Sequence, residues 1–236
     1  MFTRLSSHKQ SNIKRINYTI ISRHQRQQQI QISHYTNDGT IYEKKWIRNR
    51  NSHRIGAPAE ILFKNGIIHY EAWYKDGIIH RPGSDAPALV FYSETGNIQQ
   101  KEWFKDKKIH RHGGAPAIIT YFENGQIQCN AWYKYGKLHR TDDAPAVIAY
   151  YDNGIIEKEE WFKDGIRHRH SSAPAVISYF ENGQIKQKEW FKDGKLHYNA
   201  AGYAPSIISY FQNGMIESEE WYENGVFHSR CFPGEI

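Results

Sequence analysis

The stretch APAVIAYYDNGIIEKEEWFKDGIRHR, residues 144–169, contains the unit from which this chain is built. Its tryptophan belongs to a series that uses all seven tryptophans, at steps of 27, 30, 29, 29, 29 and 31 residues: Trp46, Trp73, Trp103, Trp132, Trp161, Trp190 and Trp221. A glycine precedes each tryptophan by seven residues, and a histidine follows each by seven. Self-similarity at a fixed period of about 20 to 50 residues is typical of repeat proteins.

Each repeat reads as a β-hairpin followed by a second turn. In the fourth repeat, residues 117–122 and 126–133 are strand-like runs on either side of Asn124-Gly125. Asn-Gly between such runs is a strong hairpin signal, because a type I′ turn needs a positive φ angle at both central residues. A second turn, such as residues 163–165 (Lys-Asp-Gly), follows the tryptophan and leads to a brief third strand.

Two repeats lack the glycine of the second turn and carry Arg50 or Lys107 in its place. A non-glycine residue held at positive φ costs on the order of 1 kcal/mol. We therefore expect these two turns to be weakened or to have a different shape.

A proline stands ahead of six of the hairpins. Proline has no N–H to donate to a neighbouring strand, so we expect it at the first residue of each strand. These prolines are Pro58, Pro87, Pro116, Pro145, Pro174 and Pro205.

The hairpin register decides which side chains share a face. A two-residue turn at Asn124-Gly125 sets Phe122 opposite Ile127 and Thr120 opposite Cys129. Both faces then mix apolar rings with polar groups, unlike the one-sided alternation of a β-sandwich. The predicted fold is all-β, an elongated antiparallel β-meander of about seven hairpin repeats of about 29 residues, which curls to bury part of each face.

Three segments divide the chain. Residues 1–29 lack the repeat marks and read as a basic N-terminal arm or as a degenerate capping repeat, with a strand over residues 13–21 in the second case. Residues 30–230 contain the seven repeats, and residues 231–236 are a C-terminal tail.

The net charge of +6 is unevenly distributed. Residues 1–54 carry eleven Lys or Arg residues against two acids, a charge of +9, so the remainder carries 6 − 9 = −3. A slightly acidic repeat array argues against a general nucleic-acid-binding rod, because such binding depends on neutralising phosphates.

Cysteine usage and hydropathy indicate the compartment. Cys129 and Cys231 occupy unequivalent repeat positions, whereas disulfides that staple a repeat protein would place cysteines in register. We therefore expect a reducing, intracellular setting, the cytoplasm, or a host cytoplasm or virion if the source is viral. We expect no signal peptide and no transmembrane segment, because no run approaches the roughly 18 apolar residues that a span needs.

The stretch FKDGIRH, residues 162–168, resembles the core of the MORN repeat, an aromatic-Lys-Asn-Gly-x-x-His pattern. The preceding half resembles the longer MORN-variant repeats of a bacterial antitoxin-like family, and the whole unit is similar to repeat proteins of amoeba-infecting giant DNA viruses. The resemblance covers about residues 30–230. It implies scaffolding, protein contacts, dimerisation and, for some members, binding of acidic phospholipids. The chain departs from MORN after the histidine, where five repeats have Arg instead of Gly.

The candidate binding residues are the repeated tryptophan, the histidine that follows it and the arginine next to that histidine. They are Trp73, Trp103, Trp132, Trp161, Trp190, His80, His110, His139, His168, His197, Arg81, Arg111, Arg140 and Arg169. The structural alternative is that the tryptophans pack between repeats with their Phe or Tyr neighbours, and that each histidine bonds to a neighbouring loop. The arginines would then pair with glutamates of the second strand or with turn aspartates.

The histidines do not predict a metal site. Equivalent histidines in adjacent repeats are expected about 10 Å apart or more, while zinc needs ligand nitrogens about 2.0 to 2.1 Å from one ion. Two pairs, His110 with His112 and His168 with His170, are close in sequence, but strand alternation would send their members to opposite faces. We expect no metal and no cofactor, and no motif of a catalytic centre predicts an enzyme.

These observations favour a non-catalytic repeat scaffold that mediates protein–protein interaction through an extended face of aromatic, His and Arg side chains. One alternative is the binding of anionic phosphate surfaces, acidic membrane lipid or nucleic acid, through the basic N-terminal arm and the repeated arginines. Another is an antitoxin-like neutralising protein. Homo-oligomerisation also stays open.

Overall fold

The computed structural model describes residues 15–24, 27–81, 85–170, 173–197 and 204–232. This part of the chain contains strands and turns and no helix, which confirms the predicted all-β class. It divides into two compact units: unit 1 comprises Met1–Ser84 and Ala88–Asn97, and unit 2 comprises Asp85–Pro87 and Ile98–Ile236. Each unit is described by itself.

Unit 1 is an antiparallel sheet with two short added pairings. Its strands are β1 (Arg15–His24), β2 (Gln27–Tyr35), β3 (Ile41–Arg48), β4 (Asn51–Ser52), β5 (Glu60–Lys64), β6 (Ile67–Ala72), β7 (Tyr74–Lys75), β8 (Ile78–Ile79) and β9 (Leu89–Tyr92). Strand β1 pairs with β2, so the second half of the segment predicted as an arm or a capping repeat belongs to the sheet. Residues 1–14 of that segment lie outside the described residues.

Unit 2 repeats one pattern. Its long strands are β10 (Ile98–Glu102), β13 (Ile118–Tyr121), β14 (Ile127–Ala131), β17 (Val147–Tyr150), β18 (Ile156–Glu160), β21 (Val176–Tyr179), β22 (Ile185–Glu189), β25 (Ile207–Tyr210), β26 (Ile216–Glu223) and β27 (Val226–Cys231). Each pairs antiparallel with the next, which confirms the predicted meander.

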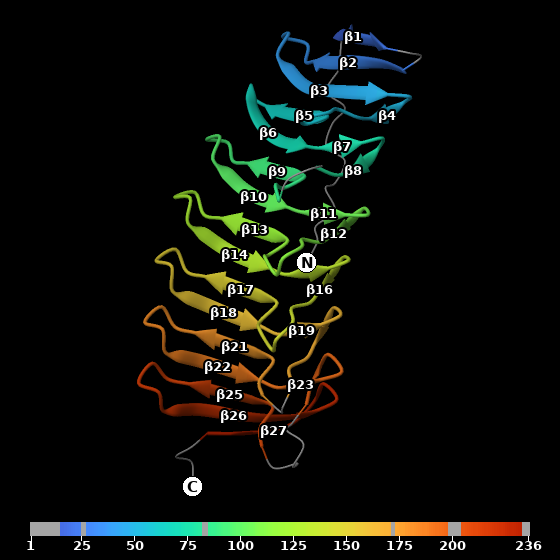
Figure 1. Cartoon of the computed structure of the whole chain (residues 1–236). Coiled ribbons are helices and arrows are strands. Elements are labelled where there is room, and N and C mark those ends of the chain that lie inside the picture. Colours follow the sequence, from blue (N-terminus) through green and yellow to red (C-terminus); the bar gives the residue numbers. More distant parts are fainter. Residues whose placement is uncertain (1–14, 25–26, 82–84, 171–172, 198–203, 233–236) are drawn as a thin grey trace. The chain divides into compact units, whose positions relative to one another are not determined.

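Short two-stranded hairpins accompany the long strands of unit 2 (Figure 1). They are β11 (Phe104–Lys105) with β12 (Lys108–Ile109), β15 (Tyr133–Lys134) with β16 (Lys137–Leu138), β19 (Phe162–Lys163) with β20 (Ile166–Arg167), and β23 (Phe191–Lys192) with β24 (Lys195–Leu196). Adjacent hairpins are joined by a bond from a turn glycine to the carbonyl of the preceding hairpin, as from Gly165 to Leu138 at 2.9 Å. The predicted third strand is therefore real, but it forms its own sheet.

The predicted type I′ geometry of the first turn is present at Asn65-Gly66, where both φ angles are positive, 52° and 77°, but not in the fourth repeat. At Asn124-Gly125 only the glycine has a positive φ, 83°, so the turn is not type I′. The Gly125 N–H donates to the Phe122 carbonyl at 2.9 Å, a type I turn followed by a left-handed glycine. This geometry adds a bulge, so Thr120 pairs with Cys129 as predicted, but Tyr121 rather than Phe122 pairs with Ile127.

The second turn has the type I′ geometry. Asp164 and Gly165 both have positive φ angles, 52° and 87°. Where glycine is missing, the turn keeps this shape: Arg50 and Lys107 have φ angles of 66° and 64°. The sequence left open whether these turns would be weakened or would have a different shape. The prediction of a different shape is wrong, because the hairpin pairing on either side forces the same backbone conformation on a less suitable residue.

The prolines do not begin strands. Pro145 lies two residues before β17, and the residue between them, Ala146, makes the connecting bonds. The Ala146 N–H donates to the Glu160 carbonyl at 2.8 Å, and its carbonyl accepts the Trp132 N–H at 2.8 Å. Trp132 thus stands at a corner between β14 and β15, which is why the predicted single strand over residues 126–133 is divided in two.

The core follows these corners. Five tryptophans are only 5% to 8% exposed, and the alanines that bond to them are at most 2% exposed. The buried tryptophans are Trp46, Trp73, Trp103, Trp132 and Trp161. An alanine leaves room for an indole ring beside it, so each repeat buries a large ring against a small residue.

Candidate interaction surfaces

The predicted tryptophan column lies in the interior. Beyond its backbone bonds, the indole N–H of Trp132 donates to the Gly114 carbonyl at 2.8 Å, and that of Trp161 donates to the Asp143 carbonyl at 2.8 Å. Trp103 makes the equivalent bond to Asp85 at 3.2 Å. Trp190 is half-buried. These rings are packed and hydrogen-bonded, as the structural alternative anticipated.

The predicted arginines cover those rings. In five repeats the guanidinium carbon lies 3.8 to 4.1 Å from the centre of the tryptophan ring of the same repeat. The pairs are Arg54 with Trp46, Arg81 with Trp73, Arg111 with Trp103, Arg140 with Trp132, and Arg169 with Trp161. Burial lowers the pKa of Arg140, and the guanidinium stays charged, as arginine does in proteins. The stack closes the column from solvent and adds cation–π attraction.

The same arginines are also hydrogen-bonded. Arg140 donates to the Pro145 carbonyl at 3.1 Å, and Arg169 donates to the Pro174 carbonyl at 3.3 Å. Arg169 also pairs with Asp143 at 3.3 Å. The predicted pairing with aspartates is therefore present for Arg111 and Arg169, whereas Arg54, Arg111, Arg140 and Arg169 form no ion pair with a second-strand glutamate in the described part of the chain.

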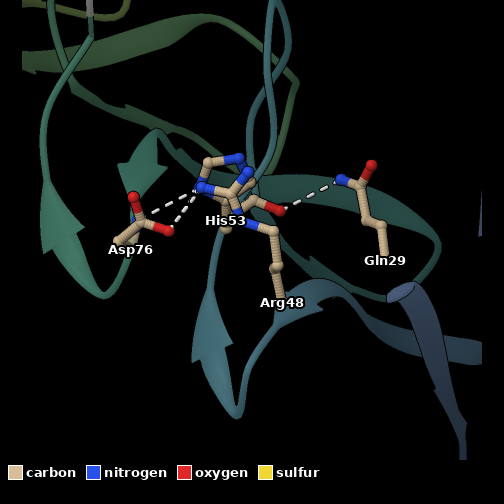
Figure 2. Close-up of polar contacts among 4 residues, drawn as sticks. All are labelled: Gln29, Arg48, His53 and Asp76. Atoms are coloured by element: carbon tan, nitrogen blue, oxygen red, sulfur yellow. Dashed lines mark hydrogen bonds and ion pairs between the residues drawn. The ribbon is translucent and has the colours of Figure 1, made fainter. Parts of the chain in front are cut away.

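Three of the repeated histidines, His53, His139 and His197, connect successive repeats, whereas both buried ring nitrogens of His110 lack a hydrogen-bond partner among the described residues. Figure 2 shows His53 of unit 1, whose Nδ1 accepts the backbone N–H of Asp76 at 3.1 Å. His139 in unit 2 accepts the N–H of Asp164 in the same way at 3.3 Å. His53 is 3% exposed, and burial together with the nearby Arg48 lowers its pKa. Its Nδ1 is therefore an acceptor of a neutral ring. The Asp76 carboxylate pairs with Arg48 at 2.6 Å, and its Oδ1 also lies 3.1 Å from His53 Nδ1.

Two histidine pairs were predicted on opposite faces, and that prediction is wrong. The rings of His110 and His112 meet edge to face with centres 4.7 Å apart, and those of His168 and His170 do so at 5.0 Å. Residues 110–112 and 168–170 lie outside strands, so strand alternation does not apply to them. The described residues include no group of three or more His, Cys, Asp or Glu placed to hold a metal ion.

Next to each tryptophan, a second set of aromatic residues is open to solvent. It comprises Phe104, Tyr133, Phe162, Phe191 and Tyr222, which we call the aromatic row. All five are half-buried rather than buried, and the first four begin the short hairpins. The sequence brought these rings to notice only as neighbours of the tryptophans.

Glutamates lie in line on the long strands beside this row. Cross-strand pairing aligns Glu102, Ile118, Ala131, Val147, Glu160, Val176, Glu189, Ile207 and Glu220. We call Glu102, Glu160, Glu189 and Glu220 the carboxylate row. It contacts the aromatic row directly at one end, where the Tyr222 hydroxyl donates to Glu220 at 2.9 Å.

The members of the carboxylate row differ in their electrostatic surroundings. Burial disfavours ionisation of Glu160, but hydrogen bonds from Arg167 and Lys158 outweigh it and hold its pKa below the usual range. Glu220 pairs with Arg230 at 2.7 Å. Burial raises the pKa of Glu102 and of Glu189, and neither has an ion-pair partner among the described Lys and Arg residues.

Other features are isolated. A hollow of about 240 Å³ beside Trp161 is lined by His139, His168, His170 and the loop that contains Asp142 and Asp143. Both cysteines are free thiols, and burial raises the pKa of Cys129 to about 11. The described residues include no helix of the length and hydropathy that a membrane crossing requires.

No known protein family matches this chain, and no curated protein matches it. The resemblance to MORN repeats therefore stays a prediction from the sequence.

Proposed function

We propose that this protein is a non-catalytic repeat scaffold that binds a protein partner through the aromatic row of unit 2. The observation that carries the proposal is the half-burial of that row beside tryptophans that are buried in three successive repeats of unit 2, Trp103, Trp132 and Trp161 at 5% to 8% exposed. The tryptophans supply the packing that the repeats need. A second set of large rings, left partly open in successive repeats, is more than folding requires.

The chemistry of the row suits a protein partner. Aromatic side chains are enriched at protein interfaces, where they bury much area at a low entropic cost. Equivalent rings in adjacent repeats are two strands apart, about 10 Å by normal strand spacing. An extended polypeptide in the polyproline II conformation rises about 3.1 Å per residue with three residues per turn, so every third residue of a bound segment would meet a ring.

The phosphate-binding alternative draws less support from the repeated arginines. Arg111 and Arg169 are paired with loop aspartates, and all five repeated guanidinium groups lie over indole rings. A phosphate would have to compete with these contacts. An antitoxin-like role is one form of protein binding, and the stoichiometry of the isolated complex would distinguish it.

Two variants of the full chain test the proposal. In the first, Phe162 and Phe191 are changed to Ala, which removes two rings of the aromatic row. In the matched control, Lys163 and Lys192, the exposed next residues on the same hairpins, are changed to Ala. Each protein is tagged and used to isolate partners from its native cells after mild cross-linking, with protein, lipid and nucleic acid all quantified.

We expect wild type and the Lys control to retain the same protein in fixed stoichiometry, and the Phe variant to lose it while circular dichroism shows an unchanged β-sheet spectrum. Equal retention by the Phe variant would contradict the proposal. Recovery of lipid or nucleic acid alone, released by raised salt, would favour the phosphate-binding alternative.

A further inference from the structure

In one repeat of unit 2, an arginine of the chain itself binds a glutamate of the carboxylate row and lies near two rings of the aromatic row. Arg167, on β20, donates to Glu160 Oε2 from Nε at 3.0 Å and from Nη2 at 2.7 Å. Its guanidinium carbon also lies 5.6 Å from the centre of the Phe162 ring and 5.4 Å from that of Phe191. A carboxylate and two flanking rings thus hold one arginine through charge-assisted hydrogen bonds and cation–π attraction.

The neighbouring repeats have the same framework without the arginine. On each short hairpin, the residue that pairs with the aromatic residue corresponds to Arg167, and it is Ile109, Leu138 or Leu196 in the other three. Beside Leu196 stands Glu189, with Phe191 and Tyr222 as the corresponding rings. Beside Ile109 stands Glu102, with Phe104 and Tyr133.

These two carboxylates are half-buried and form no ion pair, although Lys158 and Arg167 attract Glu189 from beyond ion-pair distance. No described Lys or Arg residue forms an ion pair with Glu102 or Glu189, whereas Glu160 and Glu220 each have at least one. Glu102 has only a neutral donor, the side-chain amide of Gln100. A partly buried carboxylate gains more from an added cation than a fully solvated one does, because the local dielectric is lower.

We propose that unit 2 binds a basic, extended segment of a partner protein, whose arginine side chains occupy the positions beside Glu189 and Glu102 as Arg167 occupies the position beside Glu160. This inference rests on the proposed function and specifies the chemistry of the partner. The charge of −3 carried by residues 55–236 complements a basic ligand and opposes an anionic one.

The strand order sets the spacing of the two positions. Glu102 and Glu189 are separated by six steps across the sheet, through residues 118, 131, 147, 160 and 176. At about 4.8 Å a step this is about 29 Å. An extended segment in the polyproline II conformation covers this distance in about nine residues and, with three residues per turn, places residues nine apart on the same side. A segment with two arginines nine residues apart should therefore reach both carboxylates, and the second contact should benefit from the first.

The direct test is fluorescence anisotropy of the full-length protein with a labelled twelve-residue peptide at low salt. The peptide has arginines at positions 2 and 11 in an otherwise neutral Gly/Ser/Thr sequence. The control peptide has citrulline, a neutral isostere, at both positions. We expect the arginine peptide to bind at least tenfold more tightly, with an affinity that falls as salt rises. Equal binding of the citrulline peptide would overturn the inference.

Removing the carboxylates tests the positions themselves. We expect Glu189→Gln and Glu102→Gln each to weaken binding of the arginine peptide about tenfold, since each removes one charge-assisted pair. Glu157→Gln removes the same charge from an exposed site on β18 and should leave the affinity within about twofold. A loss of the same size in Glu157→Gln would mean that only overall charge matters.

Filling one position with an internal arginine is the sharpest test. In Leu196→Arg the new guanidinium should reach Glu189 as Arg167 reaches Glu160, and the arginine peptide should bind at least tenfold more weakly. Gln184→Arg adds the same charge at an exposed turn and should weaken binding only slightly. If Leu196→Arg is well folded and binds like wild type, the inference is wrong.

The outcome separates the inference from the proposed function. If the natural partner is lost in the Phe162/Phe191 variant but kept by both Glu→Gln variants, the aromatic row binds a protein that is not held by arginines, and only the inference fails. If anionic vesicles bind and the arginine peptide does not, both fail.

Discussion

Trp161 and Phe162 are adjacent in the chain, yet they belong to two aromatic columns with different roles. Trp161 is 5% exposed, is stacked by Arg169 and donates a hydrogen bond from its indole N–H. Phe162 is half-buried, and the arginine near it, Arg167, is bound to a glutamate of the long strands. A turn of the backbone at the tryptophan places the two rings on different surfaces.

The contrast also separates what every repeat needs from what one repeat has. The Arg–Trp stack recurs in five repeats, so it is a structural element of the fold. The Arg167–Glu160 pair occurs once, where neighbouring repeats have Leu138 and Leu196. A feature shared by most repeats maintains the array, while a feature that varies is available for recognition.

The largest expected effect is a difference in the free energy of unfolding between truncation of a buried tryptophan and truncation of a residue of the aromatic row. Trp132→Ala should lower the free energy of unfolding by about 3 to 5 kcal/mol, because it leaves a cavity and breaks an indole hydrogen bond. Tyr133→Ala, at the adjacent half-buried position, should cost clearly less. Urea denaturation followed by circular dichroism measures both. Equal losses would show that the two columns do not differ in this way.

The cover of the tryptophan column should have a smaller effect. Arg140→Ala should lower the free energy of unfolding by about 1 to 2 kcal/mol, since it removes a cation–π stack and the bond to the Pro145 carbonyl. Lys137→Ala, at an exposed position of the neighbouring hairpin, is the control and should change stability by less than about 0.5 kcal/mol. Thermal denaturation of the three proteins compares them, and a neutral Arg140→Ala would contradict a structural role for the stack.

The carboxylate row allows a test of opposite signs. The folded pKa of Glu160 is lowered, so its charge stabilises the fold above the unfolded pKa near 4.5, and this is lost as pH falls through the folded pKa. The folded pKa of Glu189 is raised, so its charge destabilises the fold at neutral pH, and this penalty disappears as pH falls from above the folded pKa to below the unfolded one.

At pH 7 we therefore expect Glu160→Gln to lower the melting temperature and Glu189→Gln to raise it. Both differences from wild type should shrink toward pH 4. Melting curves from pH 7 to pH 4 measure this. Changes of the same sign at pH 7 would mean that Arg167 does not distinguish the two sites.

The smallest expected effect concerns the hairpin that carries Phe104. Lys107 has a φ of 64° in a turn where other repeats place glycine, so Lys107→Gly should raise the free energy of unfolding by about 0.5 to 1 kcal/mol. Gly165→Ala should have the reverse effect, because Gly165 has a φ of 87°. Chemical denaturation of both variants checks this, and a destabilised Lys107→Gly would mean that its side-chain contacts outweigh the backbone strain.

The sequence by itself determined the repeat, the strands and the turns. The period of the tryptophans, the glycine of each turn and the strand-like runs gave the all-β meander and most of the hairpin register, because these features depend on local backbone preferences. The same local reasoning assigned the wrong turn type to Asn124-Gly125, since a two-residue and a three-residue hairpin loop share that dipeptide.

The tertiary structure alone decided which side chains are buried and which are open. The sequence pattern predicted that Trp161, His168 and Arg169 lie on a binding face. In the structure Arg169 instead stacks over the buried ring of Trp161. The carboxylate row was not predicted, because Glu102, Glu160 and Glu189 align only through pairing between strands far apart in the chain. Sequence periodicity reports what recurs in every repeat, but burial and ion pairing depend on which neighbours the corner at each tryptophan brings together.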